Sequence, residues 1–173
     1  MIITGKHIRL KTVTPDKAGF ILSLRQHNQK SQHLTPTSGG IKEQKEWIQR
    51  YQQREKQQKE YYFVIQNLQK EDLGLVRVYD LRQDSFCWGS WLIKDNAPKL
   101  TAIRSALAIY AFGFETLGYT KSHFDVRHEN KRVLAFHLRM GAQITHQDSK
   151  NLYLEYTQKQ HQITLQKYKR FSP

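Results

Sequence analysis

The sequence predicts a mixed α+β domain built on one mostly antiparallel, twisted sheet. Several short runs alternate apolar and polar side chains or are rich in aromatic and β-branched residues, which is typical of strands. Other stretches repeat apolar residues every three or four positions, as helices with one buried face do. The last two predicted helices each connect two strands, so part of the sheet is expected to pair in parallel, because parallel neighbours need a crossover.

The first half of the chain predicts one strand, two helices and a meander of three strands. Residues 7–13 alternate in polarity and form the first predicted strand. A Thr-Pro-Asp signal starts a helix over about 16–28, and a loop rich in Pro and Gly over 33–40 separates it from an amphipathic helix over 41–60. Three β-rich runs joined by short polar links follow, at 60–68, 73–81 and 84–94.

The second half predicts two helices among the remaining strands. The first, over 99–117, ends at Gly118 and carries an apolar stripe of Leu100, Ile103, Leu107, Tyr110, Phe114 and Leu117. The elements after it are a strand at 122–127, a helix at 130–140 and strands at 142–147 and 151–157. This makes about seven strands and about four helices, in a single domain over 1–157. The basic tail over 158–173 either forms a further helix or frays.

Length and composition predict one domain in a reducing compartment. The 173 residues suffice to bury a core without disulfides or a structural metal. The single cysteine, Cys87, cannot form an internal disulfide, and no apolar run approaches the length of a membrane span. The N-terminus alternates charged and apolar residues, unlike a signal peptide. We therefore expect a cytoplasmic protein with no membrane partner.

The charge of the chain is strongly positive. Lysine plus arginine number 28 against 15 acids, a formal net charge of +13. Such an excess attracts polyanions, and nucleic acid, nucleotide-like cofactors and acidic surfaces all qualify. The alternative is a generally basic, solvated surface without a dedicated partner, because the charge is spread along the sequence. The histidines lack the paired spacing of a zinc site, so no bound metal is expected.

Six stretches occur in order along the chain: HIRLKTVTPDKAGFI, EQKEWI, YYFVI, WGSWLI, AFGFETLGYTKSHFDV and NKRVLAFHLRMGA. Together they resemble the GCN5-related N-acetyltransferase (GNAT) family, in the branch similar to ribosomal-protein alanine acetyltransferases and amino-sugar acetyltransferases. The resemblance runs from the first predicted strand to about Tyr156. It implies a splayed central pair of strands, acetyl-CoA as co-substrate and direct transfer to a primary amine in a ternary complex.

The resemblance also implies where acetyl-CoA binds. The cofactor would lie along the strand WGSWLIK, in the loop after it and against the helix over 130–140. The family's pyrophosphate loop has Arg or Gln, then Gly three residues on, then Gly or Ala two residues further on. The corresponding positions in this sequence are Ala97, Leu100 and Ala102, and only Ala102 fits the pattern. The implied cofactor-binding residues are Leu92, Ile93, Lys94, Ala97, Lys99, Leu100, Thr101, Ala102, Ile103, Asn130, Val133 and Phe136.

Leu100 leaves two interpretations open. Glycine serves such loops because the missing Cβ lets phosphate approach the backbone. Leu100 begins the apolar stripe, so it could point away into the sheet, and the charges of Lys99 and Arg104 could offset part of the change. The alternative is a domain that has lost its cofactor.

His137 is the candidate catalytic residue. The resemblance places Asn130 at a cofactor contact and His137, seven residues later, where family members commonly have a tyrosine beside the thioester sulfur. Imidazole can act as an acid near neutrality as the cation or in the right tautomer. The alternatives are a core histidine, because Val133, Phe136 and Met140 share its helical face, and a helix N-cap for Asn130.

The acceptor side is less defined. The resemblance puts Trp47 at the acceptor mouth, although a core-facing stripe with Tyr51 is an alternative. Trp88 and Trp91 lie three apart in a strand and are expected on opposite sides, so one of them could line the acceptor pocket. The predicted acceptor contacts are Trp47, Trp88 and Asp80. The base is unassigned among Asp80, Asp84 and Glu60, and Cys87 is expected to be a buried thiol.

The sequence thus predicts an acetyl-CoA-dependent N-acetyltransferase acting on a nucleotide-linked amino sugar or another small amine. Acetylation of a protein N-terminus is one alternative. A catalytically silent module that binds nucleic acid through its basic residues is another, and a homodimer is a further expectation.

Overall fold

The structure is a computed structural model that describes residues 1–26 and 39–169. Most of the predicted loop over 33–40, the end of the first predicted helix and the last four residues of the tail lie outside the described residues. The strands are β1 (Ile2–Thr4), β2 (Ile8–Thr12), β3 (Tyr61–Asn67), β4 (Asp72–Tyr79), β5 (Ser85–Ile93), β6 (Lys121–Arg127), β7 (Gln143–Gln147) and β8 (Asn151–Thr157). The helices are η1 (Pro15–Lys17), α1 (Ala18–Arg25), α3 (Ile41–Lys56), α4 (Thr101–Ala111), η2 (Phe112–Thr116), α5 (Lys131–Met140) and α6 (Gln158–Lys167).

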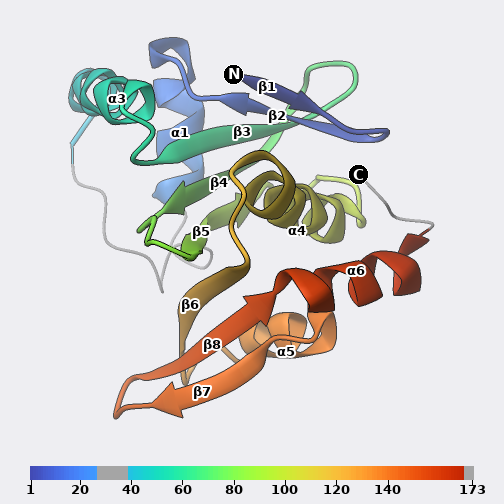
Figure 1. Cartoon of the computed structure of the whole chain (residues 1–173). Helices are drawn as coiled ribbons and strands as arrows, with labels where there is room; N and C mark the ends of the chain where they lie inside the picture. The colour runs from blue at the N-terminus through green and yellow to red at the C-terminus, as the bar shows by residue number, and fades with distance from the viewer. Residues whose placement is uncertain (27–38, 170–173) are drawn as a thin grey trace.

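One sheet runs through the molecule in the order β1-β2-β3-β4-β5-β6-β8-β7 (Figure 1). All neighbouring strands are antiparallel except β5 and β6. The mixed α+β fold is therefore confirmed, with eight strands in place of the expected seven. The additional strand, β1, has only three residues and no buried side chain, so it lacks the alternation that reveals a strand.

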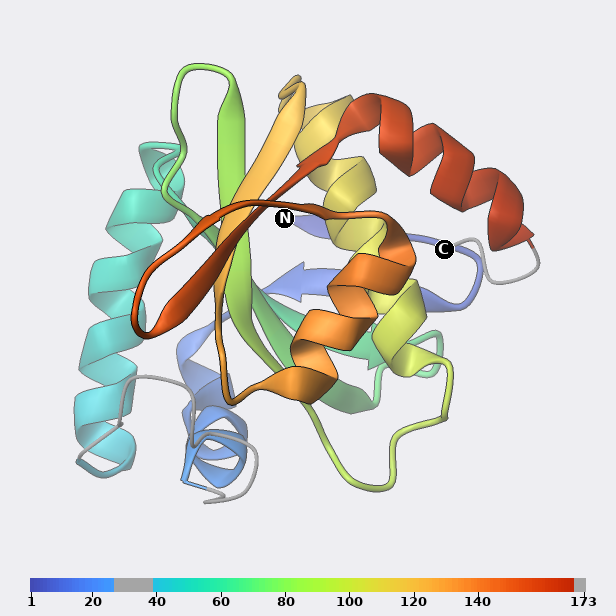
Figure 2. The ribbon, with the colours of Figure 1, turned by 90° about the horizontal axis from the view of Figure 1, so that it is seen from below.

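Helices cover both faces of the sheet, with α1 and α3 on one side and α4, α5 and α6 on the other (Figure 2). Alternate residues of β3 supply the two halves of the core. Tyr62 and Val64 pack against α1 and α3, whereas Tyr61, Phe63 and Ile65 join the larger cluster that includes α4. Burial of side chains on both faces explains the continuous run of aromatic and aliphatic residues over 61–65.

The predicted helix over 99–117 has two parts. It is α-helical to Ala111 and π-helical over Phe112–Thr116. A Cβ at Gly113 would lie 2.0 Å from the Phe86 ring, so glycine lets the sheet and this segment approach closely. The tail forms α6, which packs on the domain through buried His161 and Thr164, and the Thr164 hydroxyl donates a hydrogen bond of 2.7 Å to the Met140 carbonyl.

The central strands β5 and β6 part almost at once. They pair only at Ser85↔Lys121 and Phe86↔Ser122 and then diverge, which confirms the splayed pair. On the other edge of β5 the register shifts from Leu75↔Leu92 to Arg77↔Gly89, so β5 carries one extra residue. Ser90 in this β-bulge has φ +47°. Within the described part of the chain, no helix is long and apolar enough to cross a bilayer.

Candidate active site

A cleft of about 1440 Å³ opens where β5 and β6 part. It passes between α1, α3 and β4 on one side and the loop after β5, α4 and α5 on the other. The basic side chains that line it outnumber the acidic ones. They are Arg25, Arg77, Lys94, Lys99, Arg127, Lys131, Arg132 and Arg139, against Asp95, Asp125 and Glu129.

Most of the predicted cofactor residues meet in this cleft. Those that line it are Leu92, Ile93, Lys94, Ala97, Lys99, Ala102, Asn130, Val133 and Phe136. Leu100, Thr101 and Ile103 do not line it. Leu100 immediately precedes α4 and is half-buried, Thr101 is buried, and Ile103 packs against the core. Leu100 is therefore outside the cleft lining.

The beginning of α4 presents backbone donors to the cleft. The Thr101 N–H donates to the Pro98 carbonyl at 2.9 Å, and the first regular helical bond joins the Arg104 N–H to the Leu100 carbonyl at 3.0 Å. The N–H groups of Ala102 and Ile103 lie between these and have no acceptor within the helix. Among the described residues, no side chain caps this end of α4. Together with Lys99, these groups suit a phosphate, because the helix dipole is positive there.

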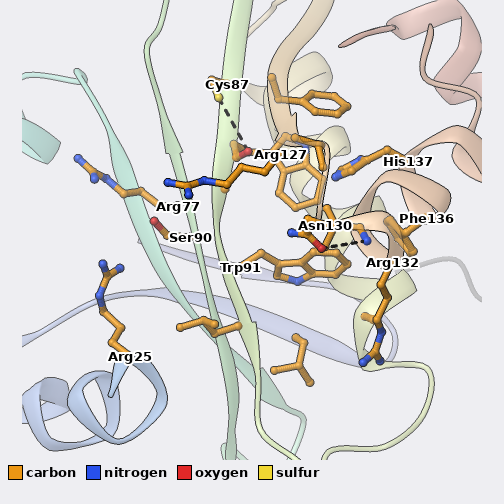
Figure 3. Close-up of a pocket in the computed structure, with 18 of the residues that line it drawn as sticks. Arg25, Arg77, Cys87, Ser90, Trp91, Arg127, Asn130, Arg132, Phe136 and His137 are labelled. Atoms are coloured by element: carbon orange, nitrogen blue, oxygen red, sulfur yellow. Dashed lines mark hydrogen bonds between the residues drawn. The ribbon is translucent and has the colours of Figure 1, made fainter. Parts of the chain in front are cut away.

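Asn130 caps α5. Its Oδ1 accepts a hydrogen bond of 3.4 Å from the Val133 N–H, while the residue also lines the cleft (Figure 3). At the other end of the helix, Gly141 adopts φ +97°, the left-handed conformation of a C-cap. These two ends fix α5, so the helical face with Val133, Phe136 and His137 turns toward the cleft.

His137 lies at the bottom of the cleft, 5% exposed. Its ring packs against Phe124, with centroids 4.3 Å apart, and against Trp88 at 5.3 Å. Burial lowers its pKa to about 3, so the imidazole is neutral at pH 7. The Tyr110 hydroxyl lies 3.5 Å from Nδ1, and burial raises the pKa of this tyrosine well above its usual value. A protonated Tyr110 that donates to Nδ1 leaves the imidazole proton on Nε2.

Trp88 and Trp91 lie on the same side of the sheet, so the expectation of opposite sides was wrong. Their rings are 5.3 Å apart, and the Trp91 Nε1–H donates to Ser105 Oγ of α4 at 3.1 Å. The cause is the bulge at Ser90, because one inserted residue reverses the side on which later side chains of β5 emerge.

The opposite side of the cleft is charged. Glu60 is buried and is bound by the guanidinium groups of Arg54 and Arg77. The Arg77 guanidinium also lies 5.7 Å from the Trp47 ring centroid and 5.2 Å from that of Tyr79. Trp47 thus lines the cleft while it packs on its neighbours. Because Glu60 is neutralised by two arginines, it is poorly suited to act as a base.

The two remaining acids considered as a base lie outside the cleft lining. Asp80 accepts hydrogen bonds from Arg82 at 2.7 Å and His123 at 2.9 Å, and the bond from Arg82 is the main reason that its pKa is lowered. Asp84 is exposed and lies 3.4 Å from the Lys121 ammonium. Because neither Asp80 nor Asp84 lines the cleft, neither would contact an acceptor bound there.

A family model described as "Acetyltransferase (GNAT) domain" matches residues 7–143. The chain belongs to the GNAT family. It is similar to the solved structure of apo FdhC, described as a nucleotide-linked sugar GNAT, with 36% identity, 100% of this chain and 99% of that chain covered, and a TM-score of 0.91. This membership makes the chain an N-acetyltransferase.

More distant GNAT structures share the fold alone. A GCN5-related N-acetyltransferase from Brucella melitensis has 14% identity and a TM-score of 0.80, over 100% of this chain and 86% of that one. The ribosomal-protein-S5-alanine acetyltransferase from Vibrio fischeri has 11% identity and a TM-score of 0.74, over 91% and 96%. A search of curated proteins finds no match.

Several residues of this GNAT cleft escaped the sequence analysis as site residues, among them Arg25, Asp125, Arg127 and, most clearly, Arg77. Tyr110, which contacts His137 from behind the cleft lining, was also missed. The guanidinium groups of Arg25, Arg77 and Arg127 lie on one side of β5, and His137, Phe136 and Asn130 lie on the other (Figure 3). The three arginines come from α1, β4 and β6, so no local spacing links them. The only signal in the sequence is their alternation with apolar residues on β4 and β6.

Proposed function

We propose that the chain transfers the acetyl group of acetyl-CoA to the primary amine of a nucleotide-linked amino sugar. The observation that carries the proposal is a single cleft that passes between the splayed strands and has two chemically different sides. One side offers helix-terminal N–H groups and apolar rings, and the other offers three arginines. The likeness to FdhC, described as a nucleotide-linked sugar GNAT, supports this class of acceptor.

The side formed by α4 and α5 fits acetyl-CoA, which supplies the reactive thioester. The N–H groups of Ala102 and Ile103, with Lys99, would hold the pyrophosphate. Asn130, Val133 and Phe136 line the path that the pantetheine arm would follow from there toward His137. Leu100 does not obstruct this path, because its side chain is outside the cleft lining.

The Trp91 N–H is the main-chain donor that would bind the thioester carbonyl. The Lys94 N–H bonds to the Leu73 carbonyl of β4, so alternate residues after the bulge direct their backbone groups toward β4. Trp91 has the opposite parity, and its N–H faces the gap between β5 and β6. A donor fixed there stabilises the negative charge that develops on the carbonyl oxygen during attack by the amine.

His137 suits the leaving sulfur. As a neutral imidazole with its proton on Nε2, it donates a hydrogen bond to the thiolate that forms when the C–S bond breaks. This resembles the role of a tyrosine hydroxyl, which is also a neutral donor. The donor requires no titration near neutrality, because the pKa of His137 is held at about 3.

The side formed by α1, α3 and β4 fits the acceptor. Arg25, Arg77 and Arg127 would bind a diphosphate, since guanidinium groups match phosphate oxygens in charge and geometry. Glu60 orients Arg77, and Trp47 provides an aromatic surface beside it. A nucleotide-linked sugar would then extend from the arginines toward the gap, where its amine reacts.

The direct test measures CoA thiol release from acetyl-CoA with UDP-glucosamine, spermidine and a peptide with N-terminal alanine as amine donors. UDP-glucose, which has a hydroxyl in place of the amine, is the matched control. We expect release with UDP-glucosamine or another nucleotide-linked amino sugar, with the mass of the product raised by one acetyl group. Acetylation of only the peptide or the polyamine, or no release with any amine, would refute the proposal.

A further inference from the structure

Asp125 faces the acceptor side of the sheet. Its neighbour Phe124 packs on His137 on the α5 side, so alternation along β6 directs Asp125 to the opposite face. That face also holds Tyr79 and Cys87, which are register partners on β4 and β5. Burial is the main reason that the pKa of Cys87 is raised to about 12, and the negative charge of Asp125 raises it further. Asp125 is thus close enough to interact electrostatically with these two residues.

Asp125 also lies at the level where the gap opens. The parallel register Ser85↔Lys121 and Phe86↔Ser122, continued residue by residue, brings Asp125 level with Gly89. Gly89 directly precedes the bulge at Ser90, and a Cβ at Gly89 would lie 2.9 Å from the Tyr79 hydroxyl on the same face as Asp125. The carboxylate therefore lies on the acceptor face at the level where the bulge begins, across the gap from β5.

Asp125 is unpaired in a basic cleft. Within residues 1–26 and 39–169 it makes no ion pair, whereas Glu60, Asp80 and Asp84 all do. Its side chain is exposed to the cleft and is flanked by Arg127 on the same face of β6. The other acids of the cleft lie elsewhere, Asp95 in the loop after β5 and Glu129 in the turn before α5.

We propose that Asp125 binds the ammonium group of the acceptor and removes its first proton, an inference that rests on the proposed function. The freed lone pair on nitrogen forms a bond to the acetyl carbonyl carbon, and the C–S bond breaks with its electron pair on sulfur. The second proton leaves nitrogen as the amide forms and ends on the thiolate, which gives CoA as the thiol. The proton on Asp125 passes to solvent.

Asp125→Asn keeps the size of the side chain and removes the base, and Glu46→Gln, at an exposed position of α3 outside the cleft lining, is the control for loss of one negative charge. With the best amine from the acceptor panel, we expect Asp125→Asn to lower kcat/KM on the order of 10²- to 10⁴-fold. Glu46→Gln should stay within about threefold of the wild type. The increase in melting temperature on adding CoA should be the same in all three proteins, because Asp125 lies on the acceptor side.

The pH profile separates a base from a merely structural residue. Without the base, the reaction depends on amine that is already neutral, so the rate of Asp125→Asn should rise about tenfold per pH unit below the amine pKa. A rate of Asp125→Asn within twofold of the wild type, or an equal loss in Glu46→Gln, would overturn the inference. If only a peptide or polyamine is acetylated and still depends on Asp125, the proposed acceptor fails while the role of Asp125 stands. If no amine reacts, both fail.

Discussion

The two sides of the cleft contrast in how they handle charge. On the α4 and α5 side, His137 is buried among the rings of Trp88, Phe124 and Tyr110 and is held neutral. On the α1 and α3 side, Glu60 is equally buried but is bound by the guanidinium groups of Arg54 and Arg77. A buried ionisable group either loses its charge or acquires partners. Here the two outcomes lie on opposite faces of the sheet, Glu60 on the α3 face and His137 on the α5 face.

This contrast matches the demands of acetyl transfer. A neutral donor beside the sulfur needs a dry surrounding, in which hydrogen bonds are stronger. A phosphorylated acceptor needs fixed positive charge, which an ion pair with Glu60 can hold in place. The β5 and β6 strands form the boundary, and in the proposed function their divergence would let the amine reach from the arginine side to the His137 side.

Replacing the neutral donor should have the largest effect. We expect His137→Ala to lower kcat by about 10²- to 10³-fold, as loss of one preorganised donor does. His137→Tyr should restore part of the rate, because it returns a neutral hydroxyl donor. The wild-type kcat should show no step near pH 6.5 from this histidine, whose pKa is about 3. Steady-state rates across pH 5–8 test both points, and a titration step that disappears in His137→Ala would disprove the neutral donor.

A second buried histidine, on the same face of the sheet as His137, should make the free energy of unfolding depend on pH in acid. His161 is fully buried among Tyr110, Phe114 and Tyr156, and burial lowers its pKa from 6.5 to about 4. Because the unfolded chain binds this proton first, the stability it contributes is complete above pH 6.5 and is lost as pH falls toward 4. The loss is about 3 kcal/mol for a shift of this size.

Denaturant unfolding at pH 7, 5.5 and 4.5 measures this loss. His161→Phe, which suits an aromatic surrounding, should make the free energy of unfolding less dependent on pH over this range. His146→Phe is the control, because His146 is exposed on β7 and should leave the dependence unchanged. Equal slopes in all three proteins would mean that His161 titrates normally in the folded state.

Removing a charge from the other side should affect acceptor binding. We expect Arg77→Met to raise KM for a nucleotide-linked acceptor about 10- to 100-fold, the cost of one charged hydrogen bond to phosphate, with little change in kcat. Arg54 still pairs with Glu60 in this variant. Arg50→Met, on the exposed surface of α3, is the control. If Arg77→Met instead raises only the KM for acetyl-CoA, Arg77 binds the cofactor and not the acceptor.

The sequence predicts most of the fold because local periodicity reports which side of an element is buried. It also places His137, Asn130 and Ala102 near one another, through a resemblance whose motifs are local. The prediction fails at Trp91, because no sequence pattern indicates that Ser90 adopts a positive φ. The resulting bulge reverses the side of the sheet on which the Trp91 side chain emerges. The arginines and Asp125 were missed for another reason, since they meet only after distant strands align in the sheet.

Substitution of Leu100, where the sequence departs from the family pattern, should have the smallest effect on CoA binding. Its φ of −88° does not require glycine, and its side chain lies outside the cleft lining. We therefore expect Leu100→Gly to change the CoA dissociation constant by less than about threefold, although it restores the residue that the family pattern has there. Ala102→Val, which adds bulk to the cleft, should weaken binding more. If calorimetry instead shows tenfold tighter binding of CoA to Leu100→Gly, the leucine obstructs the pyrophosphate. The α4 side of the cleft would then fit CoA less well than we propose.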